Sequence, residues 1–205
     1  MFIDGLHFQP WIGSNYRIGS GTLALGESHY LDEEPTEEDD FSAGYGDLTI
    51  QVVRDGFLAR ASNFRTPFFK NTGLLFDPND SYKIWSELAF ANLIQIGLAH
   101  AKSQPTEREK QTIGPAFRLL LDHLQPTRVI VLSKRMWNHW IPETTGRFVS
   151  HISVNGKYST IWEYPRSGGK CLAMGVAHPS MMLGKSRTAW KSLIDEFLLL
   201  DGESS

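Results

Sequence analysis

Cysteine is almost missing from this chain of 205 residues, which contains Cys171 alone. A single cysteine excludes a disulfide within the chain, and it excludes a metal or iron–sulfur centre built on several of the chain's own thiolates. None of the seven histidines is paired with another at the spacing of metal ligands. We therefore expect no metal, no iron–sulfur cluster and no cofactor, and an inert core thiol at Cys171.

Long apolar runs and a basic leader are missing as well. No stretch approaches the roughly eighteen apolar residues that a membrane-spanning helix needs. Residues 1–10 include Asp4, His7 and Gln9 and lack the basic flank and apolar stretch of a secretory signal. The sequence accordingly predicts no membrane partner and a cytoplasmic location.

Positive charge is not in excess, since the formal net charge is −3. Residues 32–40 alone hold seven acidic residues and no basic one, so the rest of the chain is mildly basic. We interpret this run as a solvated loop or the start of a helix, because it lacks the turn glycine of a calcium loop. With 41% hydrophobic and 21% charged residues, the chain has the composition of one globular domain over residues 1–205.

Short apolar runs alternate with segments of helical periodicity along the chain. Such alternation predicts an α/β fold, with three layers in α/β/α order around a central, mostly parallel four-stranded sheet. Residues 48–53 are β-prone, with a continuing helix as the alternative, residues 65–71 are expected to be a loop, and residues 158–164 an irregular strand. The four main strands are expected at residues 22–26, 90–95, 128–133 and 170–176, and helices around residues 84–89, 107–124, 134–140 and 190–198.

Polar residues follow three of the expected strands. Gly26-Glu27-Ser28-His29-Tyr30 comes after the first strand, Asn92 lies within or after the second, and His178-Pro179-Ser180 follows the last. Each signal alone has a plain alternative, because glycine, proline and serine are common turn residues. Ligands of parallel sheets bind at the carboxyl ends of the strands, so these residues together predict a binding site.

Taken together, Gly-Glu-Ser-His-Tyr after the first strand and His-Pro-Ser after the last resemble the two-loop arrangement of the uracil-DNA glycosylase superfamily. The resemblance extends from about Gly21 to the C-terminal helix, and His178-Pro179-Ser180 is the stronger match. It implies a monomeric DNA glycosylase, a hydrolase of base-excision repair that flips a damaged or modified base out of DNA and cleaves its N-glycosidic bond.

The resemblance also implies a role for individual residues. His178 would donate to the departing base, Asn92 would read the base edge, and Pro179 and Ser180 would hold a DNA phosphate. The loop from Gly26 through Glu27, Ser28 and His29 would position the attacking water and fence the pocket, with Tyr30 excluding bulkier bases. Glu27, Ser28 and His178 are thus the expected catalytic residues, and a ring from Phe68 or Phe69 is expected to stack on the base.

Three departures from the family pattern keep other functions open. Ser28 stands where several branches have a water-activating Asp or Asn, and His29 replaces a proline. Glu27 matches a branch that carries a four-cysteine iron–sulfur cluster, which this chain cannot build. The alternatives are a catalytically silent module that senses a nucleobase and a small-molecule nucleoside hydrolase. A basic stripe near the pocket would favour DNA; its candidates are Arg60, Arg65, Lys70, Arg166, Lys170, Lys185 and Arg187.

Overall fold

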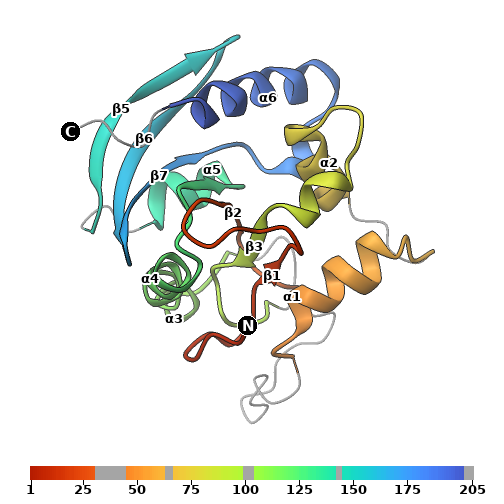
Figure 1. Cartoon of the computed structure of the whole chain (residues 1–205), viewed down its shortest axis with the longest axis vertical. Coiled ribbons are helices and arrows are strands. Elements are labelled where there is room, and N and C mark those ends of the chain that lie inside the picture. The colour runs from red at the N-terminus through yellow and green to blue at the C-terminus, as the bar shows by residue number, and fades with distance from the viewer. Residues whose placement is uncertain (31–44, 63–66, 99–103, 142–144, 201–205) are drawn as a thin grey trace.

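The structure is a computed structural model that describes residues 1–30, 45–62, 67–98, 104–141 and 145–200 (Figure 1). The acidic run at residues 32–40 and Arg65 lie outside the described residues. No helix within the described ranges is long and apolar enough to cross a membrane.

A seven-stranded mixed sheet forms the centre of the molecule, with strand order β1-β3-β2-β4-β7-β6-β5. The four neighbours β3, β2, β4 and β7 are parallel, whereas β1 pairs with β3 and β6 and β5 follow β7 in antiparallel register. The strands span Trp11–Ile12 (β1), Thr22–Gly26 (β2), Ala89–Asn92 (β3), Arg128–Val131 (β4), Arg147–Val154 (β5), Lys157–Arg166 (β6) and Gly169–Gly175 (β7).

The expectation of four strands is therefore wrong in number, although the four main strands were expected at the right places. The strands β1 and β5 were missed, and β6 is longer than the predicted segment 158–164. A two-residue turn joins β5 to β6, in which Asn155 and Gly156 both have positive φ, 50° and 73°. An Asn-Gly pair is the preferred sequence for such a hairpin turn, so this signal was readable from the sequence.

Helices pack against both faces of the sheet (Figure 1). Helix α4 (Ile113–Leu124) buries Phe117, Leu120 and Leu121 on one face, where α5 (Lys134–His139) also packs. Helix α2 (Pro67–Phe76) and helix α6 (Gly184–Leu198) cover the other face, together with the π-helical turn η1 (Val52–Leu58). The remaining short helices are α1 (Leu48–Gln51), η2 (Lys83–Ser86), α3 (Glu107–Lys110) and η4 (Pro179–Met181).

Two local predictions are changed by the structure: residues 48–53 adopt the helix that was the alternative to a strand, and the loop expected at residues 65–71 is replaced from Pro67 onward by a helix. Residues 48–53 are helical and not extended, and Val53 and Phe57, four residues apart, are both buried in the same core. Residues 65–71 were expected to be a loop, but α2 begins at Pro67. Proline is well suited to the first position of a helix, where its missing N–H has no intrahelical partner to lose.

Gly73 lets α2 lie directly against the backbone of Ser81, because a Cβ at this position would collide with that backbone. We predict that Gly73→Ala lowers the free energy of unfolding by roughly 1–3 kcal/mol through overpacking. Urea unfolding measures this change. Gly114→Ala is the matched control, since Gly114 is also helical and a Cβ there has nothing within 4 Å. Equal stability of the two variants would contradict the close approach.

Candidate functional site

The carboxyl ends of the four parallel strands meet at one edge of the sheet, and the three predicted polar signals follow from that edge. Gly26 at the end of β2 pairs in register with Asn92 at the end of β3, and Val131 of β4 pairs with Gly175 of β7. The loops that carry Glu27 and His178 therefore leave the sheet on the same side.

Glu27 and Arg135 form an ion pair at this edge. The Glu27 side chain is 6% exposed and that of Arg135 is 36% exposed. Ser133 lies between strand and helix: its hydroxyl is 3.4 Å from Glu27 Oε2, and it accepts a hydrogen bond of 3.2 Å from the Met136 N–H at the start of α5. The Ser133 hydroxyl therefore links the N-terminal cap of α5 to the buried carboxylate of Glu27.

Arg135 was not among the residues predicted from the sequence. Its guanidinium also donates to Gln104 Oε1 at 2.9 Å and lies 4.8 Å from the centroid of the Trp140 ring. These contacts hold the positive charge at the strand ends. The only sequence signal for it was its position in the first turn after the strand at 128–133, which does not reveal the direction of the side chain.

The ring of His178 is held by a hydrogen bond within its own loop. Its Nδ1 accepts from the Ser180 N–H at 3.3 Å, so the neutral ring has its proton on Nε2. Burial lowers the pKa of His178, and the nearby charge of Arg135 lowers it further. His178 is therefore neutral at pH 7 and keeps an N–H donor on Nε2.

The His178 loop is attached to helices α2 and α6 through one buried amide. Asn71 Nδ2 donates to the Pro179 carbonyl at 2.9 Å, and Asn71 Oδ1 accepts from Arg187 at 3.3 Å. From the same helix, Phe68 places its ring centroid 5.2 Å from that of His178. Asn71 was missed because residues 65–71 were expected to be an isolated loop.

Asn92 lies beside Glu27's loop because Gly26 has no side chain. A Cβ on Gly26 would collide with Asn92 Oδ1, so glycine is required for the buried amide to lie there. The side-chain amide of Asn92 forms no hydrogen bond within the described part of the chain. Its acceptor and donors are thus available to a ligand at the strand ends.

Ser28 and Tyr30 lie together at the strand ends, whereas His29 between them turns into the core. Burial raises the pKa of the Tyr30 phenol, the neighbouring Ser28 hydroxyl opposes this, and the charges of Glu27 and Arg135 also act on it. These two residues thus lie next to the ion pair. His29 is instead buried, with Nε2 2.8 Å from Thr49 Oγ1 and its ring against Phe8.

The two candidate stacking rings differ in burial and in their neighbours. Phe69 is 6% exposed and packs against Phe57, Trp85 and Phe90 in the core. Phe68 is half-buried beside His178. The structure therefore places Phe68, and not Phe69, at the candidate site.

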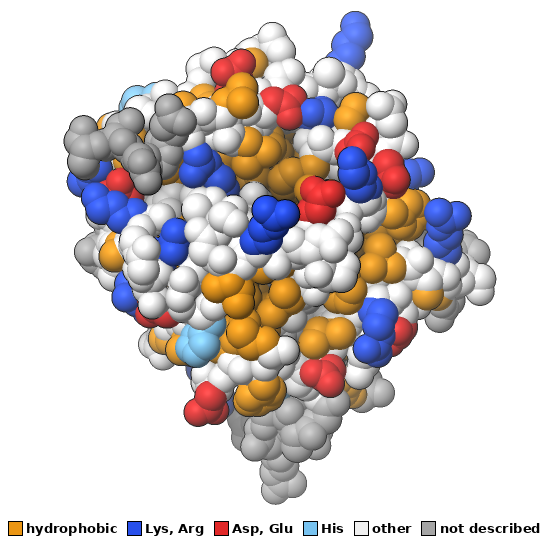
Figure 2. Space-filling view, viewed as in Figure 1, with side chains coloured by type: hydrophobic (Ala, Val, Ile, Leu, Met, Phe, Trp, Pro, Cys, Tyr) orange, Lys and Arg blue, Asp and Glu red, His pale blue; other side chains and the backbone are white. Residues whose placement is uncertain are grey.

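The candidate basic residues do not form one stripe. Arg166 and Lys170 flank the turn between β6 and β7, at the opposite end of β7 from His178. Arg187 lies near the His178 loop through Asn71, and Arg60 stacks on Tyr82. On the face shown in Figure 2, basic and acidic side chains are interspersed among the described residues.

No family model and no curated protein matches this chain. The described residues also contain no group of three or more His, Cys, Asp or Glu arranged to hold a metal ion.

The buried His29 makes the stability depend on pH. Burial lowers its pKa to about 4, whereas the unfolded ring titrates near 6.5. Between these values the unfolded state alone binds the proton, so the free energy of unfolding falls as the pH decreases through this window. We predict a loss on the order of 2 to 3 kcal/mol between pH 7.5 and 4.5 that His29→Gln largely removes.

Urea unfolding of both proteins across this range measures the effect. His178 and the carboxylates titrate in both proteins, so the difference between the two curves isolates His29. Parallel curves would contradict a buried, neutral His29.

Proposed function

We propose that this protein binds an extruded nucleobase at the carboxyl edge of the parallel strands and hydrolyses its N-glycosidic bond. The observation that carries the proposal is that Glu27 from the loop after β2, Arg135 from the first turn of α5 and His178 from the loop after β7 lie close together at that edge. The resemblance of the two loops to the uracil-DNA glycosylase superfamily supports it, and DNA containing an altered base is then the substrate.

Departure of a base builds negative charge on the base and positive charge on the sugar. The Nε2–H of neutral His178 would donate to the departing base, and the Arg135 charge nearby would stabilise the same negative charge. A neutral donor in a buried site is effective because it needs no reorganisation as the charge develops.

Glu27 would stabilise the positive charge that develops on the sugar. Its carboxylate is acceptor-only when ionised, so it would hold the attacking water and favour the positive sugar. Asn92 would read the edge of the base with its unengaged amide, and the half-buried Phe68 would lie against the base plane.

Two exposed apolar side chains beside His178 fit a nucleic-acid substrate. Met181 is 78% exposed and Leu183 is 73% exposed, while Met182 between them is buried. Apolar side chains of this kind fill the gap left in a base stack when a nucleotide is flipped out. They would keep the extruded base at the strand ends.

One observation favours a catalytically silent base-binding module as the second candidate. Glu27 is already engaged by Arg135, and Ser28 offers a hydroxyl where a second carboxylate or amide would activate water. A hydroxyl is not a base near neutral pH. The silent module would use the same residues to bind the base and would differ only in lacking turnover.

We predict that His178→Ala lowers the rate of base excision roughly 100-fold or more while the protein stays folded, because the residue lies in a loop after β7. The assay uses single- and double-stranded oligonucleotides that each carry one of four bases: uracil, hypoxanthine, thymine opposite guanine, or a modified cytosine. Alkaline cleavage then reveals the abasic sites that excision leaves. His123→Ala, at an exposed position of α4, is the matched control.

Excision that is equally fast in His178→Ala and the wild type would discard the role of His178. Binding of these oligonucleotides without excision of any base would establish the silent module. Absence of both would leave the small-molecule nucleoside hydrolase.

Glu27→Gln is expected to lower kcat about 100-fold and to change oligonucleotide Kd little, since it removes the negative charge but keeps the shape. Single-turnover excision and fluorescence anisotropy separate the two effects. Glu163→Gln is the control, because Glu163 is another shielded carboxylate paired with Arg147 and Lys170, away from the site. Equal losses in rate and affinity for Glu27→Gln would refute water positioning by this residue.

A further inference from the structure

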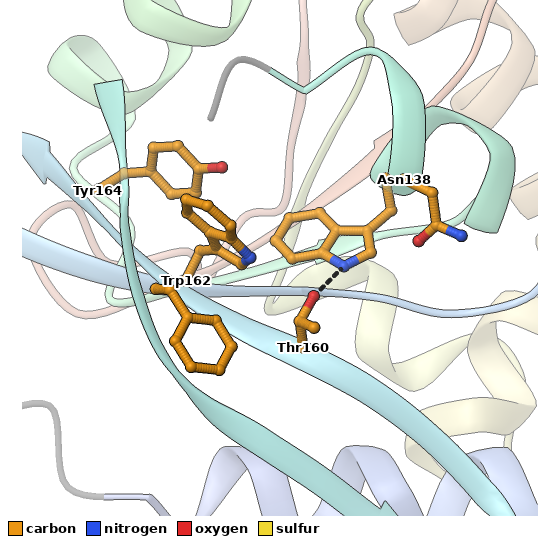
Figure 3. Close-up of a pocket in the computed structure, with 6 residues that line it drawn as sticks. Asn138, Thr160, Trp162 and Tyr164 are labelled. Atoms are coloured by element: carbon orange, nitrogen blue, oxygen red, sulfur yellow. Dashed lines mark hydrogen bonds between the residues drawn. The ribbon is translucent and has the colours of Figure 1, made fainter. Parts of the chain in front are cut away.

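A cavity of about 200 Å³, away from the candidate site, lies between α5 and the face of β6 and β5 (Figure 3). Its walls are mostly aromatic. Thr160, Trp162 and Tyr164 are alternate residues of β6 and therefore share one face of the sheet. Phe148 is the cross-strand partner of Trp162, and Trp137 closes the cavity from α5.

Hydrogen-bonding groups line this cavity without any formal charge. The Trp137 indole N–H donates to the Thr160 hydroxyl at 3.0 Å, which leaves the Thr160 O–H able to donate (Figure 3). The Trp162 N–H makes no hydrogen bond among the described residues, and the exposed amide of Asn138 supplies both a donor and acceptors.

The cavity and the candidate site share helix α5. Arg135 faces Glu27, and Trp137 follows two residues later, which places it about 200° further around the helix. The Trp137 ring packs against Gly175 at the end of β7, where a Cβ would collide with it. The two sites are therefore on opposite sides of one short helix.

The size and chemistry of the cavity define its occupant. A volume near 200 Å³ corresponds to about seven water molecules and is smaller than the roughly 300–1,000 Å³ of most drug-sized ligand sites. It suits one planar ring that stacks on aromatic walls and exchanges hydrogen bonds at its edge. The lining excludes a phosphate because none of its residues carries a positive charge that would balance it.

We propose that this cavity is an accessory site for a second, unstacked nucleobase of the same single strand whose extruded base enters the Glu27–His178 site. The inference rests on the proposed function for the identity of the strand. Stacking on aromatic side chains is tolerant of sequence, so the cavity would add affinity for single-stranded over double-stranded DNA.

Binding is tested without excision, using a fluorescein-labelled oligothymidylate in anisotropy titrations. Phe148→Ala and Asn138→Ala are chosen because Phe148 is 44% exposed and Asn138 is exposed, so neither supports the core. We expect Phe148→Ala to weaken binding about fivefold or more. Phe2→Ala is the matched control, since Phe2 is an exposed phenylalanine, 73%, near the N-terminus.

Three results would overturn the accessory site. The first is equal affinity of Phe148→Ala, Asn138→Ala and Phe2→Ala for oligothymidylate. The second is an equal loss of affinity in Phe148→Ala for an abasic strand that has no bases, and the third is binding of methyl glucoside in the cavity in place of thymidine. Base-dependent loss in Phe148→Ala supports the site even if no base is excised, in which case only the glycosylase proposal fails. If His178→Ala abolishes excision but Phe148→Ala binds oligothymidylate as tightly as the wild type, the accessory site alone is refuted.

Discussion

A buried carboxylate is tolerated only when another charge or several hydrogen bonds compensate for the water it has lost, and Glu27 is the carboxylate that places this demand on the molecule. It lies at the end of β2, in the middle of the parallel strands. The compensation comes from Arg135 and the Ser133 hydroxyl, and both belong to the start of α5. Loss of Arg135 would leave a buried charge unpaired, so the site and the packing of α5 depend on one ion pair.

The other half of the site depends on a neutral amide. Asn71 of α2 donates to the Pro179 carbonyl and accepts from Arg187 of α6, and thereby anchors the loop that carries His178. One side of the strand edge is thus organised by charge and the other by hydrogen bonds to backbone. The strand edge thus carries an anionic acceptor, Glu27, and a neutral donor, His178, which under the proposed function would act on the sugar and on the departing base.

The sequence predicted the four parallel strands and the polar residues at their ends, because short apolar runs and the residues that follow them are local features. It could not predict Arg135, whose direction depends on where α5 packs, or Asn71, whose segment looked like a loop until Pro67 began a helix. The sequence also offered no reason to prefer Phe68 over Phe69 as the stacking ring. Only the packing of α2 against the sheet places Phe68 beside His178 and Phe69 in the core. The missed strand β5 is different, since the Asn-Gly turn that joins it to β6 was visible in the sequence.

The claim that the strand ends form a base-binding site is tested most directly by ¹⁵N NMR of the histidine side chains. The account predicts that His178 at pH 7 is a neutral ring with its proton on Nε2, and that its signals move when an oligonucleotide with a non-hydrolysable 2′-fluoro-deoxyuridine is added. The signals of the exposed His123 are expected to stay in place. A protonated His178, the opposite tautomer, or His178 signals that no base-containing strand moves would contradict the account.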